Sequence, residues 1–187
     1  MTTSPRILTP PLAYESVSTL IAGDEALVTG VIYTARDAAH KRLLELIDKG
    51  RRLPVDLCGQ ILYYTGPTPV RPATGRFSAG PTTSSRMDQY TPALLAATGL
   101  AGMIGKGDRS PAVIAAMIQN NAVYFAAGGG LGALIGTCIT RSTLVCWGDL
   151  GPEAIYRFEV ENFPVITAID STGNNLYKSG PAHFKKQ

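Results

Sequence analysis

The sequence lacks any apolar run close to the roughly 20 residues that a membrane-spanning helix requires. Its first stretch, MTTSPRILTPPLAYES, has no apolar core of the kind found in secretion signals. The net charge is only +3 and the charged residues are evenly spread, so nothing argues for a nucleic-acid partner. We expect a cytoplasmic protein that binds neither membrane nor nucleic acid, with residues 1–187 forming a single domain.

Cysteine and histidine are also scarce. Cys58, Cys138 and Cys146 are odd in number and irregularly spaced, so a disulfide framework is not expected. Three thiolates could hold an iron–sulfur cluster with one open iron, but such ligands usually come from cysteine-rich loops. Here each cysteine adjoins an apolar segment, which predicts buried free thiols. His40 and His183 are too far apart for a metal site, so we assign no metal ligand to this chain.

Apolar, β-branched runs alternate with helical patterns along the chain. In residues 38–50, Leu43 and Ile47 share one helical face, Asp37 stands at the expected N-cap and Gly50 closes the helix. The alternation in the second half predicts an α/β protein with a parallel central sheet, and the strand-rich first half indicates a second, antiparallel sheet beside it. Further helices are expected at 91–98 and 111–120, and strands at 26–35, 58–64, 122–127, 142–147 and 164–170.

Four loops follow these runs, at the positions where ligands usually bind in α/β sheets. They are TARDAAHKR (34–42), GPTTSSRMD (80–88), IGKGD (104–108) and AAGGGLGALIG (126–136). GPTTSSRMD sets four hydroxyls beside Arg86, which suits a carboxylate or a phosphate; a capped helix start is the plain alternative. The irregular stretch 65–85 is either a hairpin with a wide loop or a binding loop.

Two of these loops are superficially like nucleotide-binding motifs. IGKGD departs from the pattern G-x-x-x-x-G-K-S/T, because Leu100 stands at the first glycine and Gly107 at the hydroxyl position. AAGGGLGALIG has the wrong glycine spacing for a dinucleotide site, and a turn that lets a helix pack closely on a sheet explains it better. We therefore reject a phosphate loop and a Rossmann dinucleotide site, although Lys106 between two glycines is an unusual feature.

Arg36, Arg86 and Lys106 form the cationic part of a candidate site, with Asp37 and Asp108 placed to orient them. Three cations around a hydroxyl-rich turn suit a small dianion such as a dicarboxylate. None of these groups expels hydroxide from an unactivated carbon without a Lewis acid, which this chain is not expected to hold. The site therefore predicts the binding of a dicarboxylate.

These motifs, in this order, resemble the β subunit of class I iron–sulfur fumarases and of the related L-tartrate dehydratases. The resemblance covers nearly the whole chain and rests on GVIYTARDAAHKR, GPTTSSRMD, IGKGD, AVYFAAGG, LGPEAIY and FPVITAIDSTGN. It implies a swivelling β/β/α domain. It also implies an α subunit that binds the 4Fe–4S cluster in place of this chain, in an α2β2-type assembly.

The resemblance also implies roles for individual residues. Thr82 matches the position of the base that removes the C3 proton, a role that requires cationic stabilisation of its alkoxide. Asp108 is expected to orient Lys106 or a neighbouring arginine, and His40, one turn into its helix, either faces the same pocket or is structural. The candidate catalytic residues are Thr82, Lys106, Asp108 and His40, and the candidate substrate-binding residues are Arg36, Thr82, Thr83, Ser84, Ser85, Arg86 and Lys106.

The implied reaction is the reversible hydration of fumarate to L-malate, by a hydro-lyase that is active only with its α subunit. Three other functions stay open, and one of them, a nucleotide-binding domain, predicts stabilisation by NAD or ATP. The same scaffold with an altered pocket would dehydrate L-tartrate, although IGKGD is more like the fumarases. A non-enzymatic domain that binds a dicarboxylate as a sensor would use the same cations without a partner.

Overall fold

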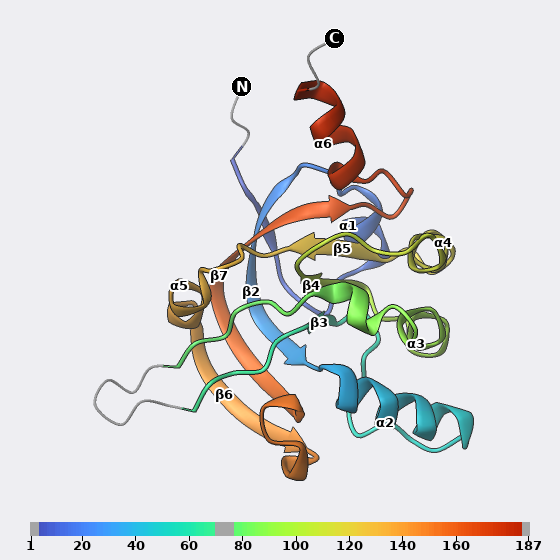
Figure 1. The fold of residues 1–187 in the computed structure, drawn as a ribbon, viewed down its shortest axis with the longest axis vertical. Coiled ribbons are helices and arrows are strands. Elements are labelled where there is room, and N and C mark those ends of the chain that lie inside the picture. The colour runs from blue at the N-terminus through green and yellow to red at the C-terminus, as the bar shows by residue number, and fades with distance from the viewer. Residues whose placement is uncertain (1–3, 70–76, 185–187) are drawn as a thin grey trace.

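The structure, a computed structural model, describes residues 4–69 and 77–184. Within this part the chain forms strands and helices in alternation (Figure 1). The strands are β1 Arg6–Leu8, β2 Glu25–Thr34, β3 Ile61–Tyr63, β4 Gly102–Gly105, β5 Val123–Ala126, β6 Ile139–Cys146 and β7 Ile155–Ile169. The helices are α1 Tyr14–Ser18, α2 Asp37–Asp48, α3 Thr91–Thr98, α4 Pro111–Gln119, α5 Gly132–Thr137 and α6 Leu176–Phe184, with short 3-10 helices η1 Ser84–Met87 and η2 Gly148–Glu153. Among these helices, none is long and apolar enough to cross a membrane.

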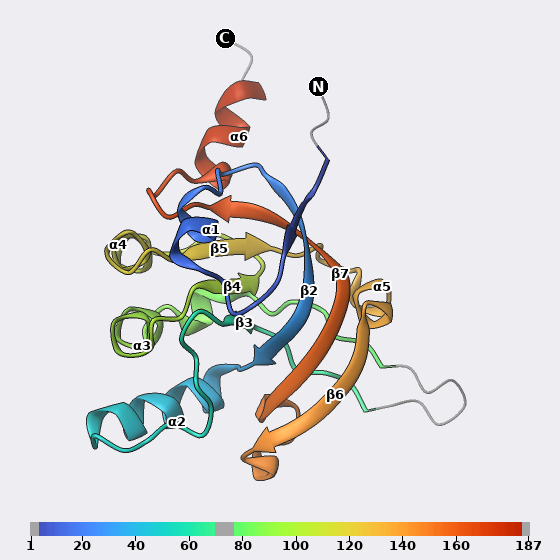
Figure 2. The same cartoon turned by 180° about the vertical axis from the view of Figure 1, so that it is seen from behind.

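All seven strands belong to one mixed sheet, in the order β1-β2-β3-β4-β5-β7-β6. Strands β1 to β5 pair in parallel, and β7 is antiparallel to β2, β5 and β6. Because β7 pairs with both β2 and β5, the sheet partly closes on itself (Figures 1 and 2). The prediction of an α/β protein with parallel central strands is confirmed.

The prediction of a second, antiparallel sheet is wrong, because the antiparallel strands continue the same sheet. Strand β7 is 15 residues long and pairs with β2 from Glu25 to Tyr33. Its first half was not predicted. There Arg157 and Glu159 alternate with the buried Phe158 and Val160, so the apolar positions never form a continuous run. A strand of this length reaches across the sheet and joins its parallel and antiparallel parts.

The parallel strands are apolar on both faces because each face is covered. Along β3, Ile61 and Tyr63 join one buried cluster, which β2, β5 and β7 share, whereas Leu62 joins a second cluster with the helices. The same alternation holds in β5, where Phe125 belongs to the first cluster and Tyr124 to the second. The carboxyl ends of these strands therefore emerge between two packed layers.

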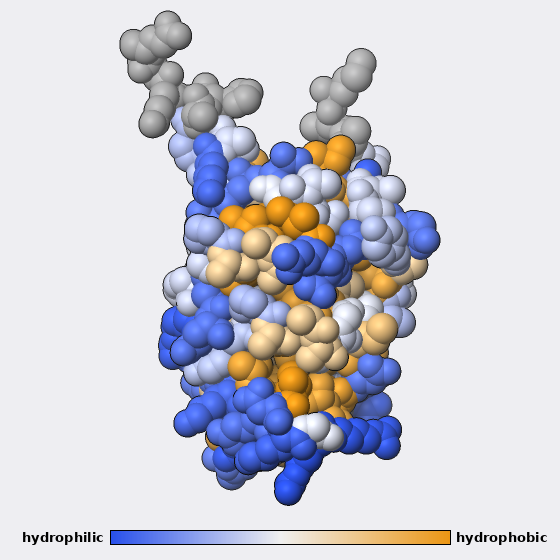
Figure 3. Space-filling view, turned by 90° about the vertical axis from the view of Figure 1, so that its right-hand side faces the viewer, coloured by the Kyte–Doolittle hydropathy of each residue, from blue (hydrophilic) through white to orange (hydrophobic). Residues whose placement is uncertain are grey.

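Helices α2, α3 and α4 lie side by side along one face of the parallel strands (Figures 1 and 2). Their outer side shows hydrophilic and hydrophobic residues in mixed patches (Figure 3). Helix α2 differs from its expected start: Arg36, with extended backbone, is the N-cap and Asp37 is the first helical residue. The carboxylate of Asp37 still lies at the amino end of the helix, where negative charge is favourable.

The stretch 65–85 takes the form of two paired arms. Thr65 bridges to Pro81 in antiparallel fashion, and the amide of Thr68 donates to the carbonyl of Ser78 at 2.9 Å. This pairing favours the hairpin with a wide loop, whose tip lies outside the described residues.

The cysteines differ from expectation, because Cys58 is exposed and the other two are only half-buried. Cys58 sits in a turn before β3, where its amide donates to Asp56 at 3.0 Å.

Candidate functional site

The carboxyl ends of β2, β3 and β4 bring the predicted loops to one edge of the sheet. The chain returns over this edge at Thr82, whose amide donates to the carbonyl of Tyr64 at 2.7 Å. Thr83 then forms a parallel bridge with Lys106 in the IGKGD turn. A side chain at Gly129 would lie 4.0 Å from Cδ of Lys106, so the glycine-rich loop after β5 is adjacent. All four loops meet here, as the order of elements indicated.

The two arginines of the site are joined through Asp37. Nε of Arg86 donates to Oδ1 of Asp37 at 3.0 Å, and Nη2 of Arg36 lies 3.8 Å from Oδ2 of the same carboxylate. Glu153, from the LGPEAIY motif, pairs with Nη2 of Arg36 at 3.2 Å. Its other oxygen accepts from the amide of Ala38 at 3.0 Å, so it also caps helix α2. Sequence reasoning missed Glu153, although its motif was recognised.

Arg36 lies in a narrow slot. A Cβ atom at Gly66 would lie 3.1 Å from Nη1 of Arg36 and 3.1 Å from the carbonyl oxygen of Pro152. The side chain of Arg36 is 21% exposed and that of Arg86 is 50% exposed. Arg36 is therefore held by its surroundings, whereas Arg86 presents half of its side chain to solvent.

Lys106 is exposed and forms no ion pair with any described residue. Among the described residues, no hydrogen bond or ion pair joins Asp108 to Lys106. Instead Oδ1 of Asp108 accepts from the side-chain amide of Asn175 and from the backbone amide of Arg109, both at 2.8 Å. The neighbouring arginine, Arg109, pairs through its side chain with Asp88. Asp108 thus fixes the end of the turn by binding the segment before α6.

The hydroxyls of GPTTSSRMD divide between two environments. Thr82 is half-buried, and Thr83 and Ser85 are exposed at the edge of the sheet. Ser84 is fully buried, and its amide donates to the carbonyl of Lys106 at 2.9 Å. The structure therefore brings three of the four hydroxyls to the accessible side of the loop and places Ser84 behind it.

A chain of hydrogen bonds links Ser84 to the lysine turn. The hydroxyl of Tyr124 donates to the carbonyl of Gly107 at 2.9 Å, so it accepts from the hydroxyl of Ser84 at 2.8 Å. The oxygen of Ser84 in turn accepts from the amide of Lys106 at 3.2 Å. Burial raises the pKa of Tyr124, so this hydroxyl keeps its proton at neutral pH. These bonds hold the GPTTSSRMD and IGKGD loops at a fixed separation.

His40 is fully buried, one turn into α2. Its Nδ1 lies 2.8 Å from the carbonyl oxygen of Arg36, so this nitrogen carries the hydrogen and donates it. Among the described residues Nε2 has no partner, and the ring packs edge-on against Tyr64 at 5.2 Å. Burial lowers the pKa of His40 to about 4, so the ring is neutral at physiological pH. His40 lies behind Arg36 and secures the start of its helix.

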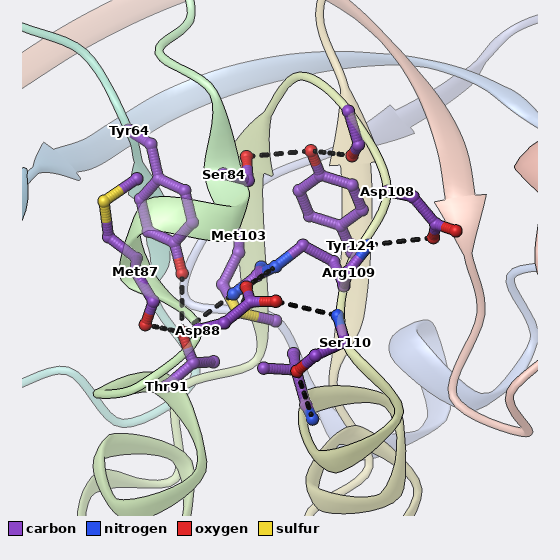
Figure 4. Close-up of polar contacts among 12 residues, drawn as sticks. Tyr64, Ser84, Met87, Asp88, Thr91, Met103, Asp108, Arg109, Ser110 and Tyr124 are labelled. Carbon is purple, nitrogen blue, oxygen red and sulfur yellow. Dashed lines mark hydrogen bonds and ion pairs between the residues drawn. The ribbon is translucent and has the colours of Figure 1, made fainter.

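The largest feature that sequence reasoning missed is the buried cation Arg109 (Figure 4). Its Nε donates to Oδ1 of Asp88 at 2.7 Å and its Nη2 to the hydroxyl of Thr91 at 2.8 Å. The guanidinium carbon lies 5.3 Å from the ring of Tyr64 and 5.1 Å from that of Tyr124. Burial opposes the charge, but these tyrosines and Asp88 raise the pKa of Arg109 above its ordinary value. Its position in the sequence KGDRS predicts a solvated residue in a surface turn.

Thr83, Ser85, Arg86 and Lys106 of the candidate site are exposed in this chain. Hollows of about 410 and 450 Å³ lie elsewhere, the first beside residues 52–57 and the second beside Phe77 and Tyr156. Within the described residues, no three Cys, His, Asp or Glu side chains are grouped to hold a metal ion. Cys138 and Cys146 lie near opposite ends of β6, about 26 Å apart at the rise of an extended strand, so the cysteines do not fit an iron–sulfur cluster.

Comparison with known proteins agrees with the geometry. Residues 6–180 match the family described as Fumarase C-terminus, and the chain therefore belongs to this family. It is 34% identical over 187 residues to the L(+)-tartrate dehydratase subunit beta of Escherichia coli K12, covering 97% of this chain and 91% of that one. A Methanocaldococcus jannaschii protein provisionally given the same name is 37% identical over 172 residues, 89% of this chain and 88% of its own.

The fumarate hydratases form a second group of relatives. The anaerobic class I fumarate hydratase of E. coli K12 is 37% identical over 152 residues. The match covers 81% of this chain but only 28% of that enzyme, so the chain spans less than a third of this longer relative. The resemblance to both fumarases and tartrate dehydratases is confirmed.

Proposed function

We propose that this chain is the β subunit of a two-subunit hydro-lyase that reversibly hydrates fumarate to L-malate. The proposal rests on one observation: Arg36, Arg86, Lys106 and the accessible hydroxyls of GPTTSSRMD meet at one open edge of the sheet. An open half-site of this kind suits a substrate that is enclosed between two polypeptides. The chain acts as one domain, which swivels as a unit against its partner.

The cations have different parts in this proposal. Nε of Arg86 is held by Asp37, and within the described residues its two Nη groups are free for a substrate carboxylate. Lys106, exposed on a turn flanked by glycines, offers an ammonium to the same or the second carboxylate. Because Arg36 is paired with Asp37 and Glu153, it adds little net positive charge to the site. Its part in this proposal is to orient the substrate.

Proton transfer at C3 is assigned to Thr82, which lies half-buried beside this group. A threonine alkoxide forms near neutral pH only where cations stabilise it. In this proposal, Arg86 and Lys106 are these cations. Ser84 and His40 are buried with their polar atoms turned to the protein, so we place them as supports for the loops and not as substrate contacts.

The 4Fe–4S cluster of this reaction class belongs, in our proposal, to an α subunit. The separated and partly exposed cysteines of this chain do not fit such a cluster. When bound in the partner, the cluster supplies the Lewis acid that departure of hydroxide requires. We propose an α2β2-type assembly in the cytoplasm.

A second candidate activity is dehydration of L(+)-tartrate. It is favoured by coverage, because the β subunits named for that enzyme match this chain over 88% and 91% of their lengths. The same cations would bind tartrate, which is also a four-carbon dicarboxylate. L-malate and L(+)-tartrate differ by one hydroxyl, so the choice between them depends on the residues that contact this hydroxyl.

The test is anaerobic co-expression with the α subunit, followed by assays on fumarate, L-malate and L(+)-tartrate. Lys106→Ala should abolish turnover with the melting temperature and subunit association nearly unchanged, since the side chain is exposed. Lys41→Ala, which removes an exposed lysine from α2, is the matched control and should keep full activity.

A loss of less than about tenfold for Lys106→Ala would take IGKGD out of the active site and favour the sensor function. Dicarboxylate binding without turnover, in a complex whose cluster is intact, would also support the sensor. Stabilisation by NAD or ATP in a thermal shift experiment would instead revive a nucleotide site.

A further inference from the structure

The side chain of Arg109 is 0% exposed, so it cannot touch a substrate at the open edge. It is nevertheless the most extensively bonded arginine near the site, with Asp88, Thr91 and the faces of two tyrosines around it (Figure 4). A buried charge without a partner is costly, and here a single carboxylate, Asp88, pairs with it. Such an arrangement calls for a role that an apolar side chain of similar size would not fill.

Arg109 directly follows the IGKGD loop, and its ion-pair partner Asp88 is the last residue of the GPTTSSRMD loop, so this pair joins the two loops that carry the candidate substrate contacts. Asp88 directly follows η1, which holds Arg86, and its second oxygen accepts from the amide of Ser110 at 2.7 Å. Asp88 thus clamps the GPTTSSRMD loop to the segment that follows IGKGD. Ser110 also caps α4 through the amide of Val113, which fixes the far end of that segment.

The two tyrosines extend the clamp from behind the sheet edge. Tyr124 packs on the guanidinium of Arg109 and binds both Ser84 and the carbonyl of Gly107 through its hydroxyl. Tyr64 packs on the same guanidinium, and its carbonyl accepts from the amide of Thr82. Only a flat cation can be stacked by these rings and bonded to Asp88 in its own plane, which suits arginine and not lysine.

We propose that Arg109 is a positioning residue, which sets the separation of Arg86 and Thr82 from Lys106 by clamping their loops from the buried side. This inference rests on the proposed hydro-lyase function for its consequence in catalysis, but the clamp itself is a property of the isolated chain. Arg109→Lys keeps the charge and loses the stacking and the bond to Thr91. It should therefore loosen both loops together.

The first arm of the test is hydrogen exchange of the full chain, which needs no activity. Arg109→Lys should speed amide exchange at least about tenfold in residues 82–88 and 104–110, with β6 and β7 unchanged. Arg42→Lys is the matched control, because Arg42 also pairs with a carboxylate and an aromatic ring, those of Asp149 and Trp147, and none of these residues lies in the two segments compared. It should leave exchange in the two segments as in the unaltered chain.

The second arm is a double-mutant cycle on kcat/KM in the complex with the α subunit. Arg109→Lys should lower kcat/KM at least about tenfold alone, and less than about threefold when Arg86→Ala, which leaves measurable activity, is already present. Fully additive losses would mean that Arg109 acts on the fold in general and would overturn the proposal. Equal exchange in both loops of Arg109→Lys and the unaltered chain would overturn it as well.

The two arms separate the two proposals. Absence of hydro-lyase turnover in the unaltered complex counts against the proposed function, while the exchange arm still decides the role of Arg109. If Arg109→Lys does not fold, Asp88→Asn, which has the same shape, replaces it in both arms. The same paired loosening is then expected, and exchange that rises over the whole chain would overturn the proposal.

Discussion

Replacing Gly105 by alanine should break the contact between the two central loops. Gly105 has an ordinary negative φ, so only space opposes a side chain there. A Cβ atom at this position would overlap the hydroxyl of Ser84 and lie 3.2 Å from its Cβ and 3.3 Å from the hydroxyl of Tyr124. The serine hydroxyl must leave, and its bonds to Tyr124 and to the amide of Lys106 leave with it.

Two contributions determine the loss of stability: the added methyl group in a filled site and the lost hydrogen bond of Ser84. Forcing a methyl group into a filled buried site costs about 1–3 kcal/mol. Losing a buried hydrogen bond adds about 1 kcal/mol. The free energy of unfolding should therefore fall by about 2–4 kcal/mol, and the melting temperature by roughly 5–12 °C for a chain of this size.

A second substitution tests the cause. Ser84→Ala removes the overlapping oxygen and should cost about 1 kcal/mol by itself, because Tyr124 keeps its bond to Gly107. In the double variant the overlap with Gly105→Ala is relieved. Its loss should be smaller than the sum of the two single losses by about 1 kcal/mol or more.

Urea and thermal unfolding of the three variants measure these values. Gly129→Ala is the control, because a Cβ atom there meets only Lys106, at an ordinary 4.0 Å. It should be neutral or slightly stabilising. Additive losses in the double variant, or a Gly105→Ala chain as stable as the unaltered one, would show that these loops are not in contact.

Three further results are expected. Arg36→Ala and Arg86→Ala should each lower kcat/KM by an amount that corresponds to about 2–4 kcal/mol of lost transition-state stabilisation. Lysine should rescue poorly, because it lacks the second hydrogen bond of a forked guanidinium. Glu153→Gln should raise KM about tenfold with a smaller effect on kcat, because it weakens the ion pair that aims Arg36. For His40, the folded pKa of about 4 lies below the unfolded value of 6.5, so the unfolded chain binds the extra proton first. Stability should fall by on the order of 1 kcal/mol per pH unit as the pH drops from 6.5 towards 4, and His40→Asn should flatten this dependence.

Each of these has its own control. Arg141→Lys changes an exposed arginine of β6, away from the site, and should keep kcat/KM unchanged. Full activity in Arg86→Lys would mean that this arginine supplies only charge. A Glu153→Gln variant that loses stability while its KM is unchanged would mean that Glu153 acts only as a helix cap. A pH profile of unfolding that is the same with and without His40 would contradict the low pKa.

The sequence sufficed where structure follows from local patterns. Apolar runs located the parallel strands, and chain order placed Arg36, Arg86 and Lys106 at one edge of the sheet, since carboxyl ends of parallel strands gather there. It did not suffice for β7, whose charged outer residues interrupt the apolar pattern, or for β1 and α1, which are too short to show a period.

The site was least predictable where burial comes from distant segments. Arg109 follows an aspartate in a turn, which predicts a solvated cation, and only the fold brings Tyr64, Asp88 and Tyr124 around it. For the same reason Asp108 binds Asn175 from the far end of the chain instead of the adjacent Lys106. Side-chain partners of polar turn residues depend on tertiary structure, which spacing along the chain does not encode.

The late position of β7 has a consequence for synthesis of the protein. Strand β2 pairs with it over most of its length, yet β7 leaves the ribosome more than a hundred residues after β2. At about 5–20 residues per second, one edge of β2 stays open on the nascent chain for on the order of ten seconds. An open strand edge invites pairing with other chains. A translational pause before Ile155 should therefore increase aggregation, and a nascent-chain chaperone bound to β2 should relieve it.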